Sequence, residues 1–277
     1  MKRANSAGLN CWTTVFFANT AAAILFTGLW PMGGQIPSWT ALWQPALVAA
    51  FFFVGQCLIF SAFGFGDVSV AVPVVSTKVI FVTAMLAIFT TERPSNAIWL
   101  AAVLATLGIL LINFIVPRSE RRVVMKIIGL ALLAAICFAA FDMCVQEFGK
   151  EWGTGRIGPF SYWFLGLYSL ALLPFANRPR EIAAARMWRE LLIGGLLVAL
   201  QVCLLVIALS NFNDAAGINV VYSLRGLWAV PFAWLAADWA GGSEARQSRA
   251  VMVCRLFGAC LLLAAVIIAI LDRSVVS

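Results

Sequence analysis

The sequence predicts an all-α integral membrane protein with about nine transmembrane helices. Of its 277 residues, 63% are hydrophobic and only 11% are charged. A water-soluble domain of this length needs many more charged residues to cover its surface, whereas helices that face lipid need none. The apolar residues also gather in runs of about 20, the length that one helix needs to cross a bilayer.

These apolar runs follow one another along the chain and are separated by loop-sized polar connections, so we expect no separate soluble domain. The first run follows a basic start, exceeds the apolar core of a signal peptide and lacks a small-residue cleavage site, so we expect a retained span. Tryptophans near the run ends fit an interfacial belt; examples are Trp12, Trp30, Trp39, Trp99, Trp188 and Trp239. The predicted spans lie roughly at residues 10–30, 40–63, 68–90, 96–116, 126–147, 159–176, 190–210, 215–238 and 251–271.

The net charge of +7 comes mainly from Lys and Arg residues in loops beside the apolar runs. Such residues determine membrane topology, so no nucleic-acid partner is expected. Alternate loops differ in their number of Lys and Arg residues. Because basic loops stay on the cytoplasmic side, we expect a protein of the cytoplasmic membrane with a cytoplasmic N-terminus and, after nine spans, an external C-terminus. The basic segment 177–190 fits either a short interfacial helix or a solvated loop. The richer set of loops holds Lys2, Arg3, Arg118, Arg121, Arg122, Lys126, Arg178, Arg180, Arg186, Arg189, Arg246 and Arg249, and the other set holds Arg93, Lys150, Arg156 and Arg273.

The residue types that most enzymes use are scarce in this chain. It contains no histidine, and its seven cysteines lie in apolar runs without a CxxC pair. Cysteines in that setting serve as small packing residues, and the missing histidine excludes Ser-His-Asp triads and HExxH zinc sites. No phosphate-binding Walker motif is present either. The sequence therefore predicts no catalytic residues, no metal site and no cofactor, and a protein that is not an enzyme.

The sequence matches itself when it is shifted by 147 residues. Residues 65–81 then lie over residues 212–228, with four identical pairs, and Lys78 falls on Arg225. Five steps from span to span separate the two copies, an odd number, so the copies cross the membrane in opposite directions. This predicts two inverted repeats, residues 1–120 with four spans and residues 121–277 with five. The first repeat lacks a partner for the span at 126–147, either because the protein has nine helices or because a first helix is missing from the chain.

The order of the spans and two segments give this pattern a family resemblance. The segments are GDVSVAVPVVSTKVIFVTAMLAIFTTERPS at 66–95 and LAAVLATLGILLI at 100–112. They resemble the EamA-like family of the drug/metabolite transporter superfamily, and residues 91–95 are similar to the family's Gly-Glu-Arg signature. The resemblance implies ten helices in two inverted halves, cytoplasmic termini and a substrate held in a central cavity. This chain departs from the family in its absent first helix, its altered second signature at 240–246 and its charge bias, which favours the opposite orientation.

Lys78 and Arg225 lie deep within predicted spans. Each is about 11 residues into its helix, which places it ~16 Å deep, near the centre of a 30 Å hydrocarbon layer. A cation at that depth costs roughly 2.5–3.5 kcal/mol, so both side chains must face a cavity or a partner. In one interpretation the pair binds an anionic group of a substrate, as the resemblance to organic-phosphate members of the superfamily implies. In the other, internal acids neutralise the pair, with Asp142 as the leading candidate.

Several polar residues near these cations complete the candidate site. The predicted substrate-binding residues beside Lys78 and Arg225 are Ser76, Ser223, Tyr222 and Asn219. Hydroxyl groups in membrane helices also bond to backbone carbonyls, so a structural role remains open for them. A further hypothesis has Asp142 and Glu147 carry a coupled proton. Asp67 and Asp214 are predicted to cap helix starts and are given no role in substrate binding.

Together these features predict a secondary transporter, acting as an exporter or exchanger, that moves a small polar and, in one interpretation, anionic metabolite by alternating access. Its predicted partners are the substrate, the lipid bilayer and a coupling proton or counter-substrate. The alternatives are a non-transporting scaffold, a channel-like protein and, less favoured, a membrane-embedded enzyme. A channel would need a filter loop or a ring of charges, which the sequence lacks. A scaffold would not need paired basic residues inside its spans.

Overall fold

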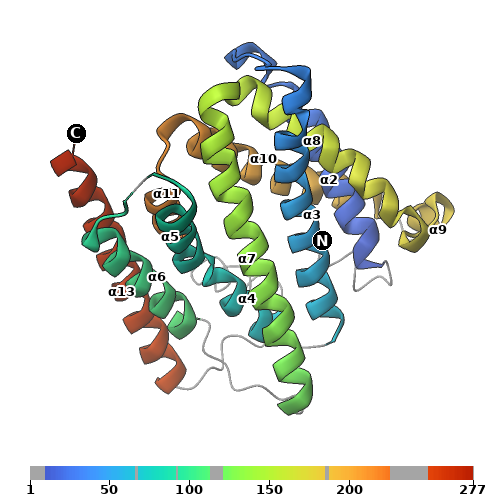
Figure 1. Ribbon diagram of the computed structural model, residues 1–277. Helices are drawn as coiled ribbons and strands as arrows, with labels where there is room; N and C mark the ends of the chain where they lie inside the picture. The colour runs from blue at the N-terminus through green and yellow to red at the C-terminus, as the bar shows by residue number, and fades with distance from the viewer. Residues whose placement is uncertain are drawn as a thin grey trace. The chain divides into compact units, whose positions relative to one another are not determined.

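The computed structural model describes residues 10–65, 68–91, 93–112, 121–184, 187–224 and 249–276, and the regular structure in these segments is helical (Figure 1). Four of the helical segments are long and apolar enough to cross a membrane, and four further apolar helices are shorter. The prediction of an all-helical, multi-pass membrane protein is therefore confirmed for the described part of the chain. The long segments are Trp39–Gly64, Arg121–Trp152, Thr154–Phe175 and Leu191–Phe212, and the short ones are Cys11–Thr27, Pro73–Phe89, Asn96–Leu111 and Phe257–Asp272.

Every predicted span overlaps at least one helix. Of the span predicted at 215–238, only the part up to Leu224 lies within the described residues. The α-helices are α2 (Cys11–Thr27), α3 (Trp43–Gly64), α4 (Val68–Ser76), α5 (Lys78–Phe89), α6 (Asn96–Ile112), α7 (Arg121–Trp152), α8 (Thr154–Ser169), α9 (Pro179–Ala184), α10 (Trp188–Phe212), α11 (Ala215–Tyr222) and α13 (Arg249–Val276). The 3₁₀ helices are η1 (Trp30–Met32), η2 (Trp39–Leu42) and η3 (Leu170–Phe175).

The helices divide into two compact units. Unit 1 comprises Met1–Phe60 and Ala140–Asn213, and unit 2 comprises Ser61–Ala139 and Asp214–Ser277. The segment Ser61–Ala139 of unit 2 extends past residue 120, where the predicted repeats meet. The shift of 147 residues carries the first residue of α4 onto the first residue of α11. The repeat, its boundary at residue 120 and its inverted arrangement stay predictions.

A buried network of polar side chains joins three helices of unit 1. The Nδ2 of Asn19 on α2 donates to Oε1 of Gln56 on α3, at 2.8 Å, and Nε2 of Gln56 donates back to Oδ1 of Asn19, at 2.9 Å. Nδ2 of Asn19 also donates to the hydroxyl of Ser169 on α8, at 2.8 Å. All three side chains are buried. Because polar groups inside an apolar unit are costly unless they are bonded, this network sets the register of the three helices.

Short connections close one end of the helices in unit 1. The backbone N–H of Gln35 donates to the carbonyl of Trp152, and Nε1 of Trp152 donates to Oε1 of Gln44. Gly34 has a φ of 110°, and a Cβ there would overlap the Trp152 carbonyl, so glycine is needed for this close approach. The guanidinium of Arg156 lies 3.9 Å from the centre of the Trp30 ring, and Nη1 of Arg156 donates to the Trp30 carbonyl.

The segment 177–190 contains the short helix α9, which confirms the helical interpretation for residues 179–184. The Glu181 carboxylate accepts hydrogen bonds from the side chain of Asn177 and the backbone N–H of Arg178, which fixes the first turn. Ile182 is buried and packs with Leu191. Arg178 and Arg180 are exposed, as a basic interfacial helix would require, while the position of α9 at a membrane surface stays a prediction.

Unit 2 is built around the pair α6 and α13. Small residues let the two backbones approach closely, because a Cβ added to Gly108 would lie 2.7 Å from the Gly258 carbonyl oxygen. At one end of the pair, the hydroxyl of Ser95 donates to Oδ2 of Asp272, at 2.8 Å. The pair therefore has close packing along its length and a polar tie at its end.

Several predicted features lie outside the described residues. They are Asp67, Glu92, Arg225, Trp239 and the segment 240–246.

Candidate functional site

The predicted span 68–90 is interrupted beside Lys78. Helix α4 ends at Ser76 and α5 begins at Lys78. Pro73 lies inside α4, where it removes one backbone donor and crowds the carbonyl of the preceding turn. The backbone N–H and the hydroxyl of Thr77 both donate to the Val74 carbonyl, at 3.1 and 2.7 Å, which closes a turn tighter than an α-helix. The sequence analysis did not predict this break, although Pro73 was its signal.

In the second segment of the predicted repeat, helix α11 also ends in a tighter turn, just before the position of Arg225. Helix α11 starts as predicted, with Oδ1 of Asp214 accepting the Gly217 N–H at 2.8 Å, so the Asp214 cap is confirmed. The helix ends at Tyr222. The Leu224 N–H bonds to the Val221 carbonyl three residues earlier, while the Ser223 N–H is shared between the carbonyls of Asn219 and Val220. The Ser223 hydroxyl donates to the Val220 carbonyl. Tight turns therefore precede both Lys78 and the position of Arg225.

Lys78 and Tyr222, two of the predicted site residues, lie together in unit 2. Nζ of Lys78 is 5.5 Å from the centre of the Tyr222 ring, which joins the start of α5 to the end of α11. The Lys78 side chain is only 9% exposed. An amine over an aromatic ring gains a cation–π attraction, and that attraction strengthens when water is excluded.

Asn219 and Ser223 lie one turn apart on α11, and both are buried. Nδ2 of Asn219 donates to the Ala215 carbonyl at 2.8 Å, while its Oδ1 has no hydrogen-bond partner among the described residues. The Ser223 hydroxyl, in contrast, donates to the Val220 carbonyl. Ser76 is half-buried at the end of α4. Among the residues that the structure describes, no donor bonds to the buried Oδ1 of Asn219.

Asp142 belongs to unit 1, whereas Lys78 belongs to unit 2. Its side chain is fully buried on α7, one residue after Phe141, whose ring lies 4.8 Å from that of Phe52. Arg225 lies outside the described residues, so the predicted pairing of Asp142 with the two cations stays a prediction.

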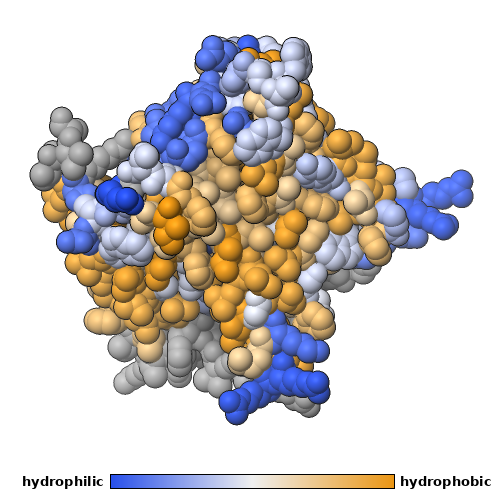
Figure 2. Space-filling model, viewed as in Figure 1, coloured by the Kyte–Doolittle hydropathy of each residue, from blue (hydrophilic) through white to orange (hydrophobic). Residues whose placement is uncertain are grey.

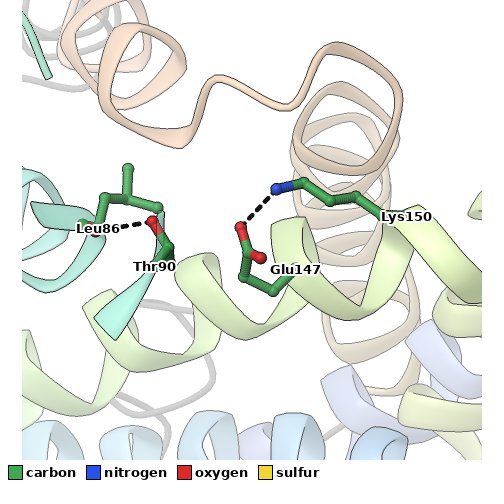
Figure 3. Close-up of polar contacts among 4 residues, drawn as sticks. All are labelled: Leu86, Thr90, Glu147 and Lys150. Carbon is green, nitrogen blue, oxygen red and sulfur yellow. Dashed lines mark hydrogen bonds and ion pairs between the residues drawn. The ribbon is translucent and has the colours of Figure 1, made fainter. Parts of the chain in front are cut away.

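Glu147, the other acid of the proton-coupling hypothesis, forms an ion pair three residues along α7. Nζ of Lys150 lies 2.7 Å from Oε1 of Glu147, and both side chains are partly exposed (Figure 3). Exposed pairs of this kind contribute about 0–1 kcal/mol. Asp142, which is fully buried, is therefore the better of the two candidates for a coupled proton.

The signature-like segment 91–95 connects the end of α5 to the start of α6. The Thr90 hydroxyl donates to the Leu86 carbonyl, as Figure 3 shows, and Nη1 of Arg93 donates to the Ala87 carbonyl at 2.7 Å. The Ser95 hydroxyl accepts the Ile98 N–H and so caps α6. These bonds satisfy the end groups of both helices, which is a role that the sequence analysis did not assign to the segment.

The described residues include no group of three or more His, Cys, Asp or Glu side chains that could hold a metal ion.

Comparison with known proteins identifies the family of the first part of the chain. Residues 1–114 match the EamA-like transporter family, which is part of the drug/metabolite transporter superfamily. This match confirms the resemblance that the sequence predicted. No curated protein matches the chain. Among solved structures, 28 chains match, and one crystal structure of a protein has a TM-score of 0.67 at 16% identity, over 94% of this chain and 88% of that one. At this identity the likeness shows the fold alone.

Proposed function

We propose that this chain, a multi-pass membrane protein with an EamA-like first part, is a secondary transporter that moves a small polar organic anion across the cytoplasmic membrane by alternating access. The observation that carries the proposal is the buried Lys78 side chain inside a span, beside the Tyr222 ring. Its equivalent in the predicted repeat is Arg225. Two cations related in this way would form the two sides of one anion site.

The cost of burying charge favours a binding role for these residues. A cation at the centre of a bilayer costs roughly 2.5–3.5 kcal/mol, whereas a cation–π contact contributes about 0.5–2 kcal/mol. The contact with Tyr222 offsets part of the cost alongside the other interactions of Lys78, and a substrate carboxylate or phosphate would add to the compensation when it binds. A protein that needed the helices only for packing would gain nothing from this arrangement.

The remaining residues of the site have distinct roles in the proposal. Lys78 and Arg225 bind the anionic group, and the open Oδ1 of Asn219 accepts a hydrogen bond from a hydroxyl or amine of the same substrate. Ser76 and Ser223 add polar contacts at the two tight turns. Because the turn at Thr77 separates α4 from α5 next to the site, these two helices can reorient as the site changes access. Asp142 carries the coupled proton.

Ligand-dependent thermal stability tests the binding part of the proposal. Detergent-purified protein is melted with separate anionic, zwitterionic and cationic metabolites, since a ligand that binds only the folded state stabilises it by about 2.7 kcal/mol at 100 times its Kd. We expect an anion to raise the melting temperature of the wild type but not of Lys78→Ala or Arg225→Ala. Arg180→Ala, an exposed cation on α9, is the matched control. Stabilisation by neutral or cationic solutes alone would instead identify Lys78 and Arg225 as partners of internal acids.

A further inference from the structure

A group of basic and apolar side chains is exposed where α7 begins. The group comprises Arg121, Arg122, Met125 and Lys126 of α7 together with Phe65, and we call it the α7 basic cluster. Arg121 and Met125 are four residues apart, as are Arg122 and Lys126, so all four side chains lie close together on the helix surface. Met125 is 60% exposed and Phe65 is 51% exposed. In Figure 2, hydrophilic side chains gather over this end of α7, next to the apolar surface of the helix.

The length of α7 sets the depth of this cluster. Lys126 and Glu147 are 21 residues apart on one helix, which corresponds to about 31 Å at 1.5 Å per residue. That distance matches the ~30 Å hydrocarbon layer of a bilayer. A hydrocarbon layer bounded at Lys126 and Glu147 would place Arg121 and Arg122 about 6 to 8 Å beyond it, at the depth of lipid headgroups.

The cluster is held partly in place by a contact between two elements. Nζ of Lys126 lies 5.7 Å from the centre of the Phe65 ring, which follows the end of α3. No acidic side chain among the described residues forms an ion pair with Arg121, Arg122 or Lys126. Three exposed cations and two exposed apolar side chains are therefore found at this end of α7.

We propose that the α7 basic cluster is a binding site for an anionic phospholipid. The guanidinium groups of Arg121 and Arg122 suit bidentate hydrogen bonding to the lipid phosphate, and Lys126 adds a third positive charge. Phe65 and Met125 contact the upper part of the acyl chains, which a soluble phosphate does not possess. This site is separate from Lys78 and is independent of what the protein transports.

The basic residues near α9 offer a matched control. Arg178, Arg180 and Arg189 are also three exposed arginines at the ends of helices. The Glu181 carboxylate lies among them and bonds to the backbone N–H of Arg178, whereas Glu120, which precedes Arg121 in the sequence, lies outside the described residues. If total charge alone determined the affinity for anionic lipid, replacing either set of three basic residues would weaken binding equally.

The test measures phosphatidylglycerol binding to the full-length protein in zwitterionic nanodiscs with increasing phosphatidylglycerol. The test variant is Arg121→Gln/Arg122→Gln/Lys126→Gln, and the control is Arg178→Gln/Arg180→Gln/Arg189→Gln. Each basic residue near an anionic surface contributes about fivefold in affinity, so we expect the test variant to lose at least tenfold and the control to lose much less. Equal melting temperatures in purely zwitterionic nanodiscs show that both variants are folded.

Three results would overturn the proposal. Equal losses in the two variants would show that the protein attracts anionic lipid only through its total charge. If glycerol phosphate or inorganic phosphate displaced the lipid at concentrations similar to that of the lipid itself, the site would recognise a soluble phosphate. Retained selectivity for phosphatidylglycerol in the test variant would place the lipid site elsewhere.

Discussion

Buried polar residues in this apolar chain differ in whether their hydrogen bonds are satisfied inside the fold. Asn19 and Gln56 bond to each other through both amide groups, whereas Asn219 leaves its carbonyl oxygen without a partner among the described residues. An amide pair of the first kind stabilises the helices that carry it. An open buried acceptor costs stability and so indicates a group that binds something else.

The Asn19–Gln56 pair leads to a prediction about stability. Asn19→Leu or Gln56→Leu alone leaves a buried amide unsatisfied and should destabilise the protein by about 1–3 kcal/mol, seen as a lower melting temperature in detergent. The double variant removes both amides and should be less destabilised than the sum of the two single variants. Strict additivity would mean that the two side chains do not depend on each other.

Asn219 leads to a prediction about binding. Asn219→Leu should weaken binding of the stabilising anion by about 1–3 kcal/mol, because the site loses its open acceptor, while the melting temperature without ligand stays equal or rises. Ser223→Ala lies one turn away and loses only a bond to its own helix, so its affinity should change much less. Isothermal titration of both variants checks this. A larger loss for Ser223→Ala would reverse the two roles.

The helices of this fold differ in where close packing requires a small residue. Gly108 on α6 faces the backbone of α13, while Gly129 on α7 has no neighbouring atom within 4 Å of an added Cβ. Both glycines lie inside apolar helices, so composition alone does not distinguish them. The surroundings of the two glycines do distinguish them, and these surroundings predict opposite effects on stability for the same substitution.

Replacing these glycines by alanine tests the packing of α6 against α13. Gly108→Ala places a Cβ against the Gly258 carbonyl and the Leu262 side chain, and overpacking of this kind typically costs about 1–3 kcal/mol. Gly129→Ala removes a flexible residue from a helix without a new contact and should be neutral or stabilising by up to about 1 kcal/mol. Thermal unfolding of both variants in the same detergent measures the difference. Equal melting temperatures would contradict the close packing of the two helices.

Across the whole molecule, the sequence predicted the apolar helices of the described segments because each needs only a long apolar run, and it predicted the Asp214 cap because the signal is local. It also selected Lys78 and Tyr222 from two segments matched by the repeat, and the structure brings them together. The break at Thr77 was missed because proline is ordinary in membrane helices. The Asn19–Gln56 pair could not be predicted, since its residues come from different helices and their bonds depend on how those helices pack.

The orientation in the membrane is a further prediction at this scale. With nine spans and more basic residues on one side, the N-terminus should be cytoplasmic and the C-terminus external. Reporter proteins that are active on only one side of the membrane, fused to either end, check this directly. Cytoplasmic signals from both ends would instead give the chain an even number of spans.

The most direct test of the transport claim is uptake of the stabilising anion into proteoliposomes by wild-type protein, Lys78→Gln and Arg180→Gln. Lys78 lies buried beside Tyr222, whereas Arg180 is an exposed cation on α9. If Lys78 binds the transported anion, Lys78→Gln should reduce the rate at least tenfold in correctly folded protein, and Arg180→Gln should stay close to the wild type. Equal transport by Lys78→Gln and the wild type would contradict the proposed site.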